Sequence, residues 1–109
     1  MSSLARTICL AAILALTSGT ACFSQALENG QRLSERWCVE CHTIGTRRAK
    51  PNRAPSFATI AARPDITAEM LAAFLLLPHA TMPNVWLSQK DASDLAAFII
   101  ESGHRSGGK

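Results

Sequence analysis

The chain of 109 residues is long enough for one small domain and too short for two. Its formal net charge is only +3, so charge alone does not indicate a nucleic-acid partner. Hydrophobic residues make up 48% of the chain, which excludes a wholly disordered protein.

The first 26 residues have the pattern of a secretory signal peptide. Arg6 precedes an apolar run over residues 8–16, and small and polar residues follow. The run is shorter than the about 20 residues that a helix needs to cross a membrane. We therefore predict export to the periplasm and cleavage after Ala26. Residues 27–109 would then form the mature domain, with no transmembrane span.

Two other fates of the leader stay open. Cleavage after Ala21 would place Cys22 at the new terminus, where a lipid could be attached, although Gly19 stands where such signals usually have an aliphatic residue. An uncleaved anchor is the third alternative. If cleavage follows Ala26, Cys9 and Cys22 are lost with the leader, and Cys38 and Cys41 are the only cysteines of the mature chain.

The mature domain begins with a predicted helix over Leu27–Cys38. Gly30, Leu33 and Trp37 share one face of this helix, and a glycine there suggests that another element packs closely. Residues 43–64 are rich in Gly, Pro, Ala and Arg and are expected to form mainly loop, with a short helical turn possible at residues 57–62.

Two further helices follow this loop. One begins after Pro64, with Asp65 or Thr67 as N-cap, and should end before Pro78. Residues 88–91 resemble a capping box that opens the last helix, which we expect to end at Gly103 and to be followed by a polar, mobile tail. Because no segment has the pattern of a strand, the predicted fold class is all-α.

The segment between the first helix and the loop is Cys38-Val39-Glu40-Cys41-His42. Two thiols at this spacing can add to the two vinyl groups of one haem, and the adjacent imidazole can bind its iron. A thioredoxin-like dithiol would need a β-α-β context, and a zinc site would need two more close ligands, which neither His79 nor His104 supplies. We predict one covalent haem c per chain, with His42 as an axial ligand.

The second axial ligand has several candidates. Met82 lies in a loop between Thr81 and Pro83, and a thioether opposite imidazole suits an electron carrier. His79 is the rival and would give a bis-histidine centre, and an open iron site is the remaining alternative. Met70 lies on the apolar stripe of a predicted helix and is interpreted as a core residue.

Several short motifs occur in an order that is familiar from one family. The chain resembles the bacterial monohaem class I cytochromes c over residues 27–109. The motifs that carry the resemblance are Gly30-x-x-Leu33-x-x-x-Trp37-Cys38-x-x-Cys41-His42, Ala54-Pro55-Ser56-Phe57, Pro78-His79-x-x-Met82-Pro83-Asn84, and Leu87-Ser88 leading to Asp94-Leu95-x-x-Phe98-Ile99.

The resemblance implies a class I cytochrome c fold, in which three main helices and their loops surround one haem. It further implies that the first and last helices cross near the haem. At this crossing Gly30 and Leu33 would pack against Leu95 and Phe98. The backbone carbonyl of Pro55 would accept the second ring N–H of His42 and orient the imidazole.

The chain departs from the family in having no tyrosine. A hydrogen bond to a haem propionate must therefore come from Trp86, Trp37, Arg53 or the backbone. We favour Arg53, since a guanidinium can donate two parallel hydrogen bonds to a carboxylate, although an exposed loop charge is an equal alternative.

The predicted function is electron transfer rather than enzymatic catalysis. The chain would be a monomeric shuttle or a small subunit, and its redox partners would be an exported dehydrogenase, a membrane complex or an oxidase. The alternative is a ligand-binding or peroxidase-like haem protein with an open or bis-histidine iron site. Basic residues at positions 47, 48, 50 and 53 could steer an acidic partner, or could simply be solvated.

Overall fold

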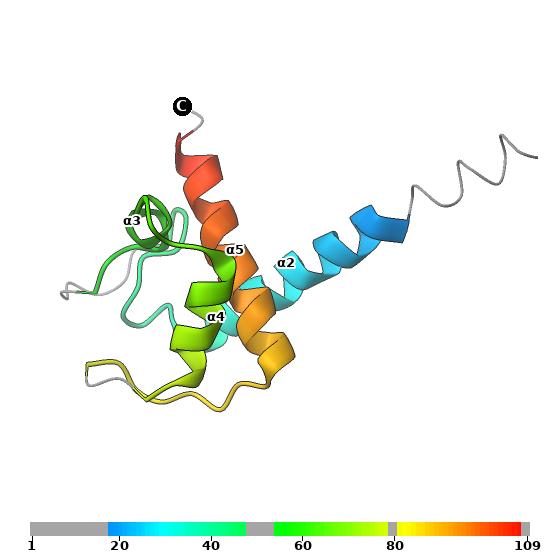
Figure 1. Cartoon of the computed structure of the whole chain (residues 1–109). Coiled ribbons are helices and arrows are strands. Elements are labelled where there is room, and N and C mark those ends of the chain that lie inside the picture. Colours follow the sequence, from blue (N-terminus) through cyan, green and yellow to red (C-terminus); the bar gives the residue numbers. More distant parts are fainter. Residues whose placement is uncertain (1–17, 48–53, 79–80, 108–109) are drawn as a thin grey trace, which may run out of the picture.

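The fold consists of helices packed around the last helix of the chain (Figure 1). The computed structural model describes residues 18–47, 54–78 and 81–107. The helices are α2 (Ser18–Trp37), α3 (Phe57–Ala61), α4 (Ala68–Leu76) and α5 (Gln89–Gly107). No strand occurs in these described ranges, which confirms the predicted all-α class.

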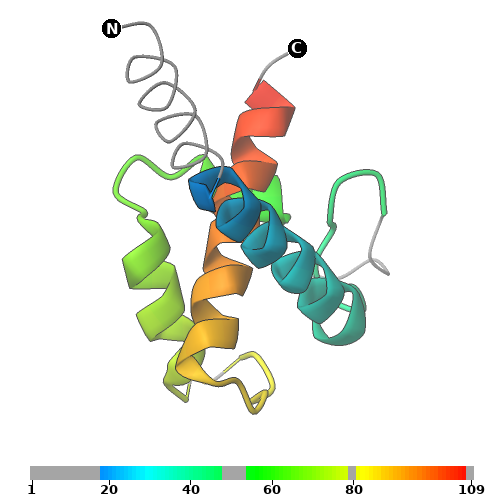
Figure 2. The same cartoon turned by 90° about the vertical axis from the view of Figure 1, so that its right-hand side faces the viewer.

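Helix α5 is the centre of the fold because each of the other three helices packs against it. Figures 1 and 2 show α2 crossing α5, while α4 lies beside the first half of α5 and α3 near its second half. The buried face of α5 includes Leu95, Phe98 and Ile99, which join residues of α3 and α4 in one hydrophobic cluster. None of the helices in the described residues is long and apolar enough to span a membrane.

The crossing of α2 and α5 depends on Gly30. A Cβ atom at this position would lie 2.6 Å from the Cβ of Phe98 and would overlap the backbone carbonyl of Asp94. Leu33, one turn further along α2, is half-buried against the cluster that contains Leu95 and Phe98. The packing expected from the family resemblance is therefore present, and it leaves no room for a side chain at residue 30.

The first helix is longer than the sequence indicated. It begins at Ser18 rather than Leu27, because residues 18–26 continue the helical conformation toward the N-terminus. It ends at Trp37, since the N–H groups of Cys38 and Val39 both donate to the carbonyl of Ser34, at 2.9 and 3.1 Å, and the chain then turns away.

The prediction that the last helix ends at Gly103 is wrong, because α5 continues to Gly107. A glycine that ends a helix usually has positive φ, and in the described residues only Gly45 does. The absence of a side chain at Gly103 serves packing instead, since a Cβ there would lie 2.5 Å from the Cβ of Ala61 in α3. His104, expected in a mobile tail, lies in the last turn of α5, 3.6 Å from Glu101.

The predicted starts of α4 and α5 agree with the structure. Of the two candidate N-caps for α4, Thr67 has the role, because its hydroxyl accepts a hydrogen bond from the N–H of Met70 at 3.2 Å. At the start of α5 the hydroxyl of Ser88 accepts from the N–H of Asp91 at 3.0 Å and donates to its carboxylate at 2.8 Å. The capping box is therefore confirmed.

Asp91 also connects the start of α5 to α2. The amide of Asn29 donates to the carboxylate of Asp91 at 3.1 Å and to that of Asp94 at 2.8 Å. Hydrogen bonds to the charged carboxylate, first from the Ser88 hydroxyl and then from Asn29, lower the pKa of Asp91 below its usual value of 3.8.

We expect Gly30→Ala to destabilise the holoprotein by about 1–3 kcal/mol, the usual cost of forcing an extra methyl group into a packed interface. Urea unfolding monitored by circular dichroism measures the change. Gly107→Ala is the matched control, because no atom lies within 4 Å of a Cβ at that end of α5. Equal stabilities of Gly30→Ala and Gly107→Ala would contradict the close crossing.

We expect Asp91→Asn to lower stability by about 0.5 kcal/mol at pH 7, a typical value for an exposed carboxylate in a first helical turn. Because the pKa of Asp91 is lower in the folded chain than the 3.8 of a free carboxyl, its contribution is complete above pH 3.8. This contribution to stability disappears as the pH falls through the pKa that Asp91 has in the folded chain. Unfolding of the wild type and of Asp91→Asn at a series of pH values should show a difference in stability that vanishes in acid. A difference that does not change with pH would refute the role of the Asp91 carboxylate.

Candidate haem site

The Cys-x-x-Cys-His motif forms a tight turn directly after α2. The N–H groups of Cys41 and His42 both donate to the carbonyl of Cys38, at 3.1 and 2.8 Å. This turn brings two thiols and one imidazole into a short stretch of backbone. Both cysteines are free thiols rather than a disulfide, as covalent attachment of a haem requires.

The imidazole of His42 is held by the loop that precedes α3. Its Nδ1 lies 2.7 Å from the carbonyl oxygen of Pro55, the contact expected from the family resemblance. A carbonyl oxygen can only accept, so Nδ1 must carry the proton and Nε2 keeps its lone pair. His42 is thereby prepared to bind a metal through Nε2.

His42 also has a contact with an aromatic ring, which was not expected from the sequence. The ring of Phe57, the first residue of α3, lies 5.6 Å from the His42 ring between centroids. Sequence analysis placed Phe57 in a short helical turn but contained no signal that would pair it with His42. The contact depends on how α3 packs against α5, which is a property of the folded chain.

An apolar cavity lies beside Cys38, bounded on its other side by the loop of Met82. Its lining residues come from the end of α2, from α4, from the loop before α5 and from α5 itself. They are Trp37, Cys38, Leu75, Met82, Pro83, Asn84, Val85, Leu87 and Leu95. The structure therefore brings Met82 to the same cavity as the first cysteine of the motif, although these residues are far apart in the chain.

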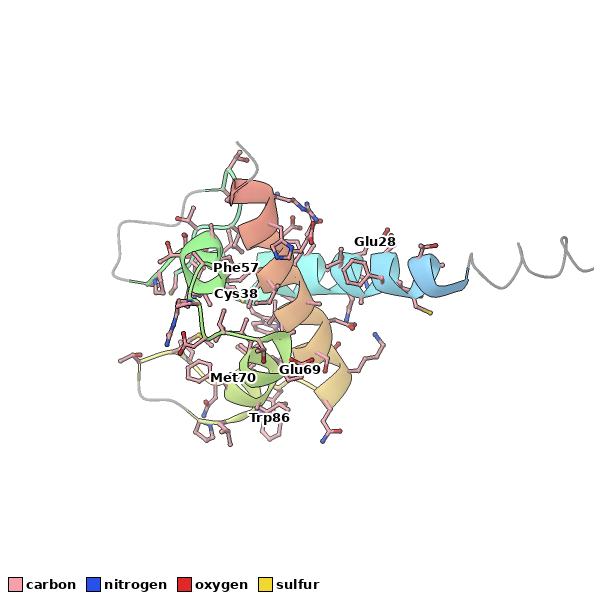
Figure 3. All side chains as sticks on the ribbon, turned by 45° about the horizontal axis from the view of Figure 1, so that its top comes forward. Glu28, Cys38, Phe57, Glu69, Met70 and Trp86 are labelled. Carbon is pink, nitrogen blue, oxygen red and sulfur yellow. The ribbon has the colours of Figure 1, made fainter. Side chains whose placement is uncertain are left out.

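The other predicted methionine lies elsewhere. Met70 is 52% exposed on α4 and does not line the cavity, so its interpretation as a core residue is wrong (Figure 3). The helix packs on α5 through Leu71, which is 6% exposed, and the helical rotation between adjacent residues turns Met70 away from that buried side.

Sequence analysis also missed several residues that line the cavity, among them Leu75 and Val85. A usable signal was present, because residues 70–89 contain no Asp, Glu, Lys or Arg. A charge-free stretch that spans a helix, a loop and the candidate ligand Met82 indicates an apolar environment around that ligand.

The environment of Cys38 argues against a reactive dithiol. Burial, reinforced by the charge that Cys41 would carry, raises the pKa of the Cys38 thiol to about 11. Nucleophilic cysteines of redox enzymes have a lowered pKa instead. The zinc alternative gains no support either, because the described part of the chain contains no group of three or more His, Cys, Asp or Glu placed to hold a metal ion.

The donor set fits a haem c. Two free thiols and an imidazole with an available Nε2 match the covalent bonds and the iron of this cofactor, and the lining beside Cys38, which includes the thioether of Met82, is apolar as a macrocycle requires. When bound, the haem supplies an iron that takes up and releases one electron.

Some of the predicted site residues lie outside the described residues, namely His79, Arg53, Arg48 and Lys50. Of the other candidate propionate donors, Trp86 is fully exposed and Trp37 is half exposed (Figure 3). Arg47 is one of the basic residues in the loop after His42. It is exposed and lies 4.0 Å from the carboxylate of Glu35.

Comparison with known proteins identifies the family. The chain is 43% identical over 95 residues to a cytochrome c-552 of Bradyrhizobium diazoefficiens, and the aligned region covers 86% of this chain and 90% of that protein. No family model and no solved structure matches the chain significantly. The aligned region extends over nearly all of both sequences, and this chain has an all-α fold and a haem-attachment motif. The chain therefore belongs to the small monohaem cytochromes c, electron carriers rather than enzymes, with one covalently bound haem c.

Proposed function

We propose that this cytochrome carries single electrons in the periplasm on a haem whose iron is bound by His42 and Met82. The observation that carries the proposal is the position of Met82, which lines the same apolar cavity as Cys38. His42 is oriented for the other face of the iron by the Pro55 carbonyl. A thioether opposite an imidazole favours reduced iron and raises the reduction potential.

The composition of the cavity favours a carrier over a ligand-binding or peroxidase-like protein. A peroxidase-like site needs an open iron position and an acid–base group beside it. The lining residues in the described part of the chain include no His, Asp or Glu. With Met82 as the sixth ligand, oxygen and peroxide have no position on the iron, and electron transfer at the edge of the haem remains.

The leader and the partners are part of the same proposal. We infer removal of residues 1–26 on export, because Arg6, the apolar run and the small residues that follow it have the pattern of a signal peptide, and N-terminal sequencing of the exported protein identifies the cut. A lipid on Cys22, which is exposed on α2, would instead increase the intact mass. The partner would be an exported dehydrogenase, a membrane complex or an oxidase, with Arg47 and the other basic residues of its loop as one docking surface.

Replacement of Met82 by Ala should open the sixth coordination position. We expect the methionine-to-iron charge-transfer band of the ferric protein to disappear, the reduced protein to bind carbon monoxide, and the potential to fall by on the order of 0.1 V, within the range that axial ligands control. Met70→Ala is the control, because Met70 is exposed outside the cavity and should leave all three properties unchanged. Ready carbon monoxide binding by the reduced wild type would contradict ligation by Met82.

Replacement of both Cys38 and Cys41 by Ala should abolish covalent attachment. After treatment with acidified organic solvent, the haem of the wild type should stay with the polypeptide, whereas any haem held by the double variant should be extracted. Mass spectrometry of the polypeptide measures the difference. Cys22→Ser is the control and should retain the haem, since Cys22 is outside the motif; loss of the haem from this control would show that attachment does not use Cys38 and Cys41 alone.

A further inference from the structure

Two hydrogen bonds join the haem motif to the start of α3. The Nδ1–H of His42 donates to the carbonyl of Pro55 at 2.7 Å, and the N–H of Phe57 donates to the carbonyl of Thr43 at 3.1 Å. The hydroxyl of Ser56, between these two contacts, caps α3 by accepting from the N–H of Thr59 at 3.0 Å. The first residue of α3 is therefore held beside the imidazole by its backbone.

The side chain of Phe57 occupies the space between the imidazole and α5. It is 2% exposed, and its ring is tilted by 47° to the His42 ring at a centroid distance of 5.6 Å. On its other side it meets Phe98 of α5 edge-on, at 6.3 Å and 74°. Phe98 in turn lies at the crossing with Gly30. The imidazole therefore packs against the Phe57 ring (labelled in Figure 3), which itself packs against the core.

We propose that Phe57 is a positioning residue that fixes the rotation of the His42 ring about its bond to the iron. A single hydrogen bond at Nδ1 tolerates a broad range of angles, so the Pro55 carbonyl alone restrains the ring plane weakly. A packed aromatic ring beside the imidazole limits the remaining rotation, because interior side chains have little free volume. The proposal rests on His42 being an axial ligand, as stated under the proposed function.

The orientation of the ring has a spectroscopic consequence that general stability does not have. In a ferric low-spin haem, the plane of an axial imidazole, together with the orientation of the opposite ligand, determines which iron orbital holds the unpaired electron. That orbital sets the relative paramagnetic shifts of the four haem methyl groups in the proton NMR spectrum. A change of ring plane therefore alters the pattern of these shifts, whereas a simple loss of packing energy does not.

The test compares the wild-type ferric holoprotein with Phe57→Leu and Phe98→Leu. Both variants remove a ring from the same buried cluster, but only Phe57 has a ring contact with His42. We expect Phe57→Leu to rearrange the methyl shifts and to accelerate solvent exchange of the His42 Nδ1 proton by at least about tenfold. Phe98→Leu should change both much less. An unchanged pattern in Phe57→Leu, or an equal change in Phe98→Leu, overturns the proposal.

Two controls keep the result interpretable. Where Phe57→Leu yields no holoprotein, Phe57→Met replaces it, since methionine keeps apolar volume without a planar ring. The His42 ring protons of the wild type report ligation separately, because a histidine ring has large paramagnetic shifts only when it is bound to the iron. Their absence would refute the ligation by His42 and this proposal with it, whereas their presence with an unaltered methyl pattern in the variant refutes the role of Phe57 alone.

Discussion

The close approach of α2 to α5 at Gly30 is the contact on which the remaining structure depends. It brings the backbone of α2 against the carbonyl of Asp94 and the side chain of Phe98, at a distance that no other residue type allows. The haem motif begins where α2 ends, so the crossing also places the two cysteines and His42 relative to α5. Because α3 and α4 also pack on α5, this contact places the haem motif relative to the described helices that surround the site.

The two sides of the site differ: the side of His42 is held by several contacts, and the side of Met82 is apolar. On the first side, the tight turn of the motif and the Pro55 carbonyl hold His42, and the Phe57 ring packs beside it. On the apolar side, a stretch without charged residues supplies the cavity wall and Met82. Apolar surroundings stabilise the additional positive charge of an oxidised haem iron less than water does, so the surroundings as well as the ligands influence the reduction potential.

These features suit a protein that transfers electrons and performs no chemistry on a substrate. A carrier works best when its ligands move little between the oxidised and reduced states, and the contacts of His42, the proposed ligand, restrict the movement of its ring. The cytochrome c-552 that shares 43% of its residues over nearly the whole length supports the same assignment at the level of the family. The packing of Phe57 adds a structural reason for the position of the imidazole.

The sequence by itself determined the haem motif, the all-α class and the helix starts at Thr67 and Ser88. The motif and the two helix starts depend on residues within about four positions of one another, and the all-α class follows from the apolar periodicity of each segment, so all of them can be recognised in the local chain. Only the tertiary structure decided that Gly103 accommodates Ala61 inside a longer α5, that Met70 faces outward, and that Phe57 meets His42. Those outcomes are contacts, or missing contacts, between helices, and a helical pattern identifies an apolar face without showing which element will cover it.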